Sequence, residues 1–183
     1  TNGSALLRED AMIPRVGTKV FTERVTYDEA SKRVEKTANG DIEVKTVLTR
    51  DTVGASWKYK MNFRWMPSEA LYGLGSHMED YMNLKGKELY LCQHNLKAMV
   101  PVINSTAGYG LLFDAVFSML FRDTEEVGYV ELEAAKQIDY YFMKGKTMDA
   151  VIANYRLLTG KSPMMPLYLF GYIQSKERYV SSD

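Results

Sequence analysis

The most regular pattern of hydrophobic and polar positions runs from Trp57 to Trp65. Apolar side chains occupy every second position, and Lys, Asn or Arg side chains lie between them. Because successive side chains of a strand point to opposite faces, this pattern predicts a strand with one face in a core and the other in water. Residues 41–50 alternate similarly. The side chains that share one face of that second segment are Ile42, Val44, Thr46 and Leu48.

Turn signals and short apolar segments extend the prediction to a whole domain. Asn39-Gly40 is a strong hairpin signal, since both residue types tolerate positive φ, and strands are expected beside it at 21–27 and 33–37. Many short strands separated by polar and glycine-containing turns predict an all-β sandwich. The further segments expected to be strands are 100–104, 110–114, 117–122, 127–132 and 137–143.

One segment follows a helical period instead. From Met148 to Leu158, apolar residues recur at spacings of three and four positions. Thr147 is a suitable N-cap and Gly160 can close the helix. The prolines that follow, beginning with Pro163, prevent its continuation.

The last apolar run extends from Leu167 to Ile173 and ends in a polar cluster at residues 174–179. This order is typical of the first strand of a further domain, with functional groups at its C-terminal end. Because a lone strand cannot bury itself, we expect the chain to be a piece of a longer protein.

Composition and charge narrow the function classes. Lys+Arg and Asp+Glu both number 23 among 183 residues, and this balance argues against a nucleic-acid partner. No apolar run approaches the roughly 18 residues of a membrane helix, so no membrane partner is expected. Cys92 is the only cysteine, and the two histidines lie far apart, so no metal or other cofactor is expected. Cytoplasmic, periplasmic and secreted locations all stay open.

Several motifs are interpreted as structural. Residues 71–75 (Leu-Tyr-Gly-Leu-Gly) lack the third glycine of a dinucleotide loop, so a tight turn or bulge after a strand is expected. Gly108-Tyr109-Gly110 is interpreted in the same way. Asn104-Ser105-Thr106 fits a glycosylation sequon and is assigned no role.

Acidic residues and aromatic rings give no clear site. Glu79-Asp80, Glu125-Glu126 and Asp139 lack the apolar surroundings that acid–base catalysis uses, so they are expected to be solvated. Aromatic rings can stack on sugars, but most of the 13 Tyr, 7 Phe and 2 Trp alternate in strand patterns and are expected in the core.

The order of the motifs resembles the N-terminal β-sandwich domain of glycoside hydrolase family 31, which contains retaining α-glucosidases and α-xylosidases. The ending Gln-Ser-Lys-Glu-Arg-Tyr is most similar to the α-xylosidase branch, and Ala5–Glu9 resembles a strand and turn of that sandwich. One departure is Ser105-Thr106-Ala107, where family members often carry Ser-Ser-Lys. The matching stretches are 69–75, 91–101, 104–114, 139–145, 155–166 and 171–179.

The resemblance implies a mainly β fold: an antiparallel, galactose-mutarotase-like supersandwich with one C-terminal helix. The sandwich would start part-way into the family domain, with its first strands missing. The segments implied are the sandwich at 1–146, a helix and proline linker at 147–166, and the first strand of a truncated (β/α)8 barrel at 167–183.

The family chemistry is double displacement by two barrel aspartates, and the resemblance places neither in this chain. No catalytic residue is therefore expected here. Asn95 lies in a loop that, by similarity, reaches over the barrel mouth, so it is a candidate for a hydrogen bond to a sugar hydroxyl; the alternative is a turn cap. Gln174, Ser175 and Lys176 are candidate walls of the sugar site, since barrel strands carry active sites at their C-terminal ends. The alternative for these three is a structural loop.

The function implied is a non-catalytic part of a retaining α-glycosidase that supports the barrel and helps to shape the sugar site. Its partners would be an α-xyloside or α-glucoside substrate, through the longer protein, and the barrel itself; an oligomer is possible. The alternatives are a stand-alone carbohydrate-binding module, a purely structural domain, and an α-glucosidase in place of an α-xylosidase.

Overall fold

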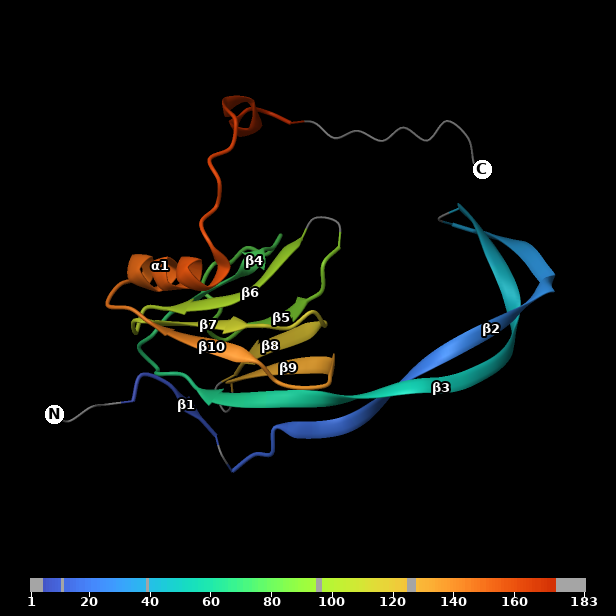
Figure 1. Ribbon diagram of the computed structural model, residues 1–183, viewed down its shortest axis with the longest axis horizontal. Coiled ribbons are helices and arrows are strands. Elements are labelled where there is room, and N and C mark those ends of the chain that lie inside the picture. The colour runs from blue at the N-terminus through green and yellow to red at the C-terminus, as the bar shows by residue number, and fades with distance from the viewer. Residues whose placement is uncertain (1–4, 11, 39, 95–96, 125–127, 174–183) are drawn as a thin grey trace. The chain divides into compact units, whose positions relative to one another are not determined.

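The computed structural model describes residues 5–10, 12–38, 40–94, 97–124 and 128–173. That part of the chain forms ten strands, one α-helix and one 3-10 helix (Figure 1). The chain divides into a sandwich unit, Thr1–Val20 with Ala55–Lys161, and a second unit, Phe21–Gly54 with Ser162–Asp183. The strands are β1 Arg8–Glu9, β2 Val16–Thr37, β3 Gly40–Arg64, β4 Leu71–Ser76, β5 Glu88–Leu91, β6 Ala98–Ser105, β7 Tyr109–Phe113, β8 Met119–Asp123, β9 Gly128–Ala135 and β10 Tyr140–Lys144.

Two antiparallel sheets form the sandwich unit. The first has the strand order β1-β3-β9-β8-β5, with β2 also paired to β3. The second has the order β10-β7-β6-β4. Antiparallel sheets with alternating side chains bury one face each, and the two apolar faces meet as a core. The predicted β-sandwich is therefore confirmed.

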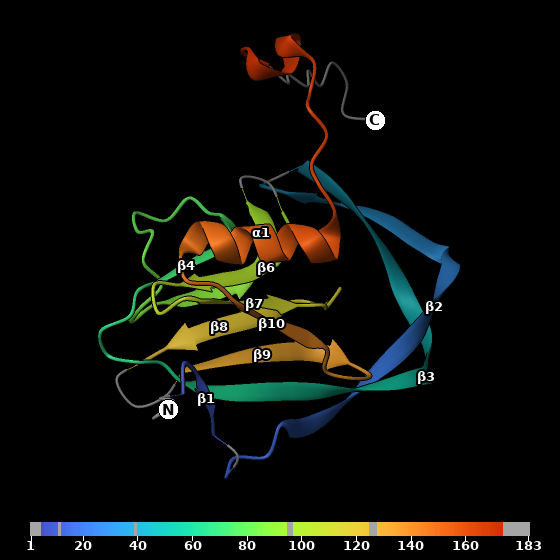
Figure 2. The same cartoon turned by 60° about the vertical axis from the view of Figure 1, so that its left-hand side comes forward.

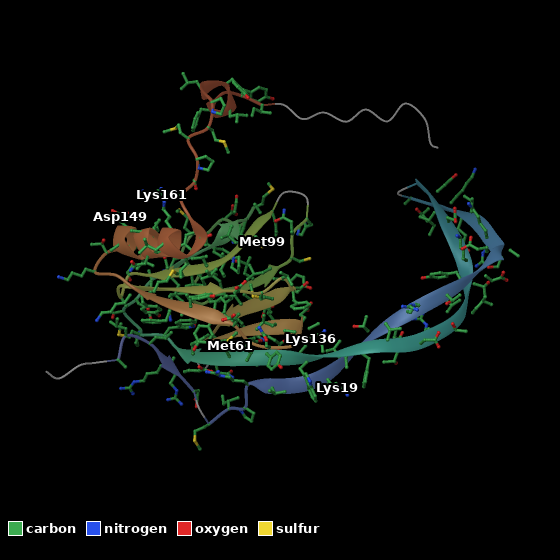
Figure 3. The ribbon with its side chains drawn as sticks, viewed as in Figure 1. Lys19, Met61, Met99, Lys136, Asp149 and Lys161 are labelled. Carbon is green, nitrogen blue, oxygen red and sulfur yellow. The ribbon has the colours of Figure 1, made fainter. Side chains whose placement is uncertain are left out.

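The core lies between the sheets and draws on both. The alternation predicted for Trp57–Trp65 is confirmed along most of β3: Met61, labelled in Figure 3, is fully buried, and Phe63 is 2% exposed. Phe63 also contacts Phe113 of the other sheet, with ring centroids 6.4 Å apart. Trp57 departs from the prediction, since it is 39% exposed.

Helix α1, Met148–Thr159, covers the outer face of the second sheet (Figure 2). Its predicted caps are confirmed, because the Thr147 side chain accepts a hydrogen bond from the Ala150 backbone N–H and Gly160 closes the helix. Val151 is the buried residue of α1, and it packs with Val102 and Met143 in a small cluster separate from the main core. No helix in the described residues is both long and apolar enough to cross a bilayer.

The sequence patterns did not predict two of the strands, β4 and β5. Residues 71–76 form β4, with a register shift between Gly73 and Gly75, so the expected bulge lies inside a strand and not after one. Strand β5 is only four residues long and pairs with β8. Both depend on pairing with strands distant in the sequence, which no local pattern encodes.

The second unit contains a long ribbon in which β2 and β3 run together as a twisted hairpin (Figure 1). We call its residues 21–54 the arm. The predicted hairpin is confirmed, although strands expected as separate pieces form one continuous β2. The expected burial of one face is wrong: no described residue between 21 and 54 is buried. Asn39, half of the predicted turn, lies outside the described residues.

The predicted strand at 167–173 differs from the structure, which has a 3-10 helix at Leu167–Phe170. A strand needs neighbours to pair with, and none of the described residues pairs with this segment. Local hydrogen bonds form instead, from the Leu169 N–H to the Pro166 carbonyl at 3.0 Å and from the Gly171 N–H to the Tyr168 carbonyl. The assignment of residues 167–183 to a barrel stays a prediction.

Candidate functional site

A pocket of about 350 Å³ opens beside the ends of three strands from both sheets. It lies where β5 ends and where β6 and β8 begin, with Met99 (labelled in Figure 3) on its β6 side. Phe117 is 41% exposed and offers a ring to a ligand or a neighbouring domain. The lining residues are Leu91–Gln93, Met99–Pro101 and Ala115–Met119.

The Gln93 side chain holds the loop at the rim of this pocket. Its amide nitrogen donates to the Lys97 carbonyl, and its amide oxygen accepts from the Met99 N–H at 3.0 Å. A backbone hydrogen bond from Lys97 to the His94 carbonyl, at 3.2 Å, closes the same loop. The residues on either side of positions 95–96 are therefore fixed by both side-chain and backbone bonds.

A salt bridge joins this loop to the segment after β4. The Lys97 Nζ lies 3.1 Å from the Glu79 Oε1. Glu79 and Asp80 are both exposed. Asp139, which lies just before β10, is exposed as well. These three carboxylates are solvated or paired on the surface, as expected, whereas Glu125 and Glu126 lie outside the described residues.

The proposed sugar-contacting residues fall outside the described residues. This holds for Asn95 in the rim loop and for Gln174, Ser175 and Lys176 after the 3-10 helix. Their roles stay predictions. Among the described residues, no group of three or more His, Cys, Asp or Glu side chains is placed to hold a metal ion.

A buried polar cluster went unnoticed in the sequence. Glu69 is only 5% exposed, and its carboxyl group accepts hydrogen bonds from the Ser105 hydroxyl, the Tyr109 hydroxyl and the Met66 backbone N–H. Three donors from three different segments thus converge on one carboxyl group, which satisfies it away from water. Burial, and then the hydrogen bond to Glu69, raise the pKa of Tyr109. No local pattern predicts the cluster, because the two hydroxyl donors lie 36 and 40 positions from Glu69.

The middle residue of the Asn104-Ser105-Thr106 sequon, Ser105, belongs to this cluster. Ser105 is fully buried, and its hydroxyl both donates to Glu69 and accepts from the Ala107 N–H at 3.0 Å. The Asn104 side-chain oxygen is also buried. These two residues therefore end β6 inside the fold.

A second hollow, of about 330 Å³, lies between β4, β6 and α1. Its walls are mostly apolar and include Val100, Ile152 and Tyr155. Val100 borders the first pocket as well, so the two hollows are neighbours. Val100 is 41% exposed and Ile152 is 44% exposed.

No protein-family model matches the chain. Individual curated proteins do match the chain. An α-xylosidase of Saccharolobus solfataricus is 36% identical over 140 residues, which are 70% of this chain and 19% of that protein. A family 31 glucosidase of Pseudescherichia vulneris, itself uncharacterized, is 30% identical over 128 residues, which are 69% of this chain and 24% of the relative. The chain thus spans about a fifth to a quarter of the length of these relatives.

Solved structures share the fold. A GH31 α-xylosidase from a soil metagenome, solved with xylose, superposes with a TM-score of 0.59 at 25% identity, covering 75% of this chain and 18% of that one. A xylosidase from Aspergillus niger gives a TM-score of 0.61 at 22% identity, covering 81% of this chain and 23% of that one, and supports the fold alone.

Proposed function

We propose that this chain, which belongs to glycoside hydrolase family 31 as an N-terminal β-sandwich portion, is the non-catalytic part of a longer retaining α-glycosidase that acts on α-xylosides. The observation that carries the proposal is the sequence match to an α-xylosidase over most of the chain. In a retaining enzyme the two carboxyl groups lie roughly 5 Å apart on either side of the scissile bond. We place both carboxyl groups in the barrel and outside this chain.

The sandwich would support the barrel through the apolar surface around α1. Val100, Ile152 and Leu158 expose large parts of their side chains there, and the second hollow lies between two of them. Clustered exposed apolar side chains mark surfaces that another domain covers. This surface supports docking of the barrel against the outer side of β6 and α1.

The docking proposal is tested by charge insertion. In the longer protein, Ile152→Glu should lower the thermal midpoint and the yield, because a carboxylate would be buried against the barrel. In this chain alone the same change should leave the midpoint nearly unaltered. Ile13→Glu is the matched control, since Ile13 is also part-exposed, at 38%, and should be neutral in both proteins. Equal effects of Ile152→Glu in the two proteins would contradict the proposal.

The sandwich would also contribute to the sugar site through Asn95. The flanks of this residue are held by the Gln93 amide and by the Lys97 backbone, which is the preorganisation that a substrate contact needs. An amide side chain can both donate to and accept from a sugar hydroxyl. Gln174, Ser175 and Lys176 are proposed as further walls of the same site.

The functional test compares hydrolysis of aryl α-xyloside and aryl α-glucoside by this chain and by the longer protein. We expect no turnover by the chain alone, turnover by the longer protein, and preference for the xyloside. Asn95→Ala in the longer protein should raise KM by about tenfold, the effect of losing one ~1.4 kcal/mol hydrogen bond. Gln137→Ala, at an exposed position, serves as the control. Turnover by the chain alone would refute the non-catalytic assignment.

A stand-alone carbohydrate-binding module is the second candidate, favoured by the exposed Phe117 ring beside the first pocket. Titration of the chain with xylo- and gluco-oligosaccharides separates the two. Saturable binding that Phe117→Ala abolishes would favour the module, whereas no binding favours the supporting role.

A further inference from the structure

Glu79 is an acidic residue to which neither the core nor the family chemistry assigns a role. It lies three residues after the end of β4, in the connection to β5. Its Oε1 lies 3.1 Å from the Lys97 Nζ, and the Glu79 and Lys97 side chains are 36% and 21% exposed. An ion pair that is partly shielded from water is screened less by salt than a fully exposed pair. This pair can therefore hold the two segments that it joins.

Lys97 is the residue through which Glu79 reaches the rim of the first pocket. It belongs to the rim loop, the connection between β5 and β6, whose described residues are 92–94 and 97. Its N–H donates to the His94 carbonyl at 3.2 Å, and its own carbonyl accepts from the Gln93 amide. Both of these bonds lie inside the rim loop. The ion pair with Glu79 is the contact among these three that ties Lys97 to another part of the sandwich.

The segment that carries Glu79 is itself anchored. Tyr81, two residues further on, packs against the main core, and its hydroxyl donates to the Glu88 carbonyl of β5 at 3.4 Å. Burial raises the pKa of Tyr81 most, the charge of Glu79 raises it further, and the charge of Lys97 lowers it. Both charges of the pair thus lie close to an anchored ring. Glu79 is fixed to the sandwich on one side and holds the rim loop on the other.

We propose that Glu79 is a positioning residue for the rim loop: through Lys97 it holds the loop in the conformation that receives the glycoside. This role rests on the proposed function, in which Asn95 of the same loop bonds a sugar hydroxyl. When a binding-competent conformation is populated for a smaller fraction of the time, the apparent affinity falls by that fraction. Glu79 does not touch the reacting atoms, so its loss should raise KM and leave kcat unchanged.

The first test is the steady-state kinetics of the longer protein with an aryl α-xyloside. Glu79→Gln should raise KM about three- to fivefold, the scale of one partly exposed ion pair, with kcat within about twofold of the wild type. Asp80→Asn is the matched control. It removes the same charge one position along, at an exposed residue that belongs to none of the described ion pairs, so KM should be unchanged. Equal increases of KM in the two variants would overturn the proposal.

A charge swap separates the pairing from the mere presence of each side chain. Glu79→Lys and Lys97→Glu should each raise KM, whereas the double variant restores the attraction and should return KM toward the wild-type value. A double variant no better than either single variant would overturn the proposal. Salt gives a second readout, because about 1 M salt shortens the screening length to roughly 3 Å and the substrate is uncharged. It should raise KM of the wild type more than that of Glu79→Gln.

Amide hydrogen exchange of this chain tests the positioning without any substrate. Glu79→Gln should speed exchange of the Lys97 and Met99 amides about three- to fivefold relative to β8 and β9, and Asp80→Asn should not. Unchanged exchange would overturn the positioning role, even if the longer protein hydrolyses glycosides. Faster exchange in a protein that hydrolyses none would uphold the hold of Glu79 on the rim loop and refute the proposed function instead. An unchanged thermal midpoint in both variants excludes misfolding as the cause.

Discussion

The Tyr109 hydroxyl donates a hydrogen bond of 2.8 Å to the Glu69 carboxyl group, across 40 positions of sequence. Tyr109 begins β7, and Glu69 lies in the connection between β3 and β4, so the bond joins the loop that crosses between the sheets to the start of an inner strand of the second sheet. Tyr109 is fully buried and Glu69 nearly so. A buried carboxyl group that receives three donors fixes the position of each donor, and we infer that it sets how β4 enters the sandwich.

We expect Glu69→Gln to destabilise the sandwich by about 1–3 kcal/mol, the cost of leaving buried donors without an acceptor. The amide keeps the size of the side chain but replaces one accepting oxygen by a donating nitrogen. That nitrogen faces either the Ser105 and Tyr109 hydroxyls, which both donate to Oε2, or the Met66 N–H, which donates to Oε1. Chemical denaturation of this chain measures the loss.

A matched control exists on the surface of the same fold. The Tyr90 hydroxyl donates to the Glu133 carboxylate at 2.8 Å, the same pair of groups at the same distance but exposed to solvent. Glu133→Gln should therefore change the free energy of unfolding by less than about 0.5 kcal/mol. Similar losses for the two variants would show that burial is not what gives the Glu69 cluster its effect.

Alkaline pH should weaken the sandwich through Tyr109. Burial and the hydrogen bond to Glu69 raise the pKa of this phenol above its unfolded value of about 10. The unfolded chain then releases a proton that the folded chain keeps, so the stabilising contribution is complete below about pH 10 and is lost as pH rises beyond it. Thermal midpoints measured between pH 7 and pH 11 should fall more steeply for the wild type than for Tyr109→Phe. Tyr168→Phe, which alters a tyrosine that is 75% exposed, should follow the wild-type curve.

Sequence patterns predicted the features that depend on residues close together in the chain. The caps of α1 and the alternation of Met61 and Phe63 along β3 are of this kind, because a few neighbouring residues determine them. The Glu69 cluster could not be foreseen in this way. Its two hydroxyl partners lie 36 and 40 positions away, and only the folding of the sheets brings them to Glu69.

The predictions that were wrong have a common physical cause. Alternating apolar residues indicate that one face of a strand is apolar, but they do not indicate whether another part of the protein covers that face. Ile42 and Leu48 follow the strand pattern as closely as Met61, yet both are exposed, because no described residue of the arm itself packs over them as a second layer. In the same way, the apolar run that begins at Leu167 does not by itself form a strand, since strand formation depends on partners that the local sequence does not supply. The candidate sugar contacts at Asn95 and Lys176 depended on the family resemblance alone.

The glycines of β4 allow a close approach of two backbones, which a pair of substitutions can measure. Gly75 has φ +96°, and a Cβ there would lie 2.0 Å from the Ala98 carbonyl oxygen of β6. Gly86 also has positive φ, at +72°, but open space surrounds it. Gly86→Ala should cost only the ~1–2 kcal/mol of a side chain in the left-handed region. Gly75→Ala should cost several kcal/mol or prevent folding, since backbone must move as well. Equal midpoints of chemical denaturation for the two variants would show that β4 and β6 separate without cost.

Docking of α1 onto the second sheet should depend on one side chain. Val151 is fully buried against Val102 and Met143, whereas Ile152, the next residue, is 44% exposed. Val151→Ala removes two buried methyl groups and leaves a cavity, so we expect a loss of about 2 kcal/mol in the free energy of unfolding. Ile152→Ala removes more hydrocarbon in total, but a large part of that side chain is in water, and alanine is the better helix former, so its effect should stay within about 0.5 kcal/mol. Hydrogen exchange of the α1 amides provides a local readout: Val151→Ala should speed exchange throughout α1 more than in β8 or β9. Uniform acceleration across the sandwich would indicate instead that α1 and the sheets unfold as one cooperative unit.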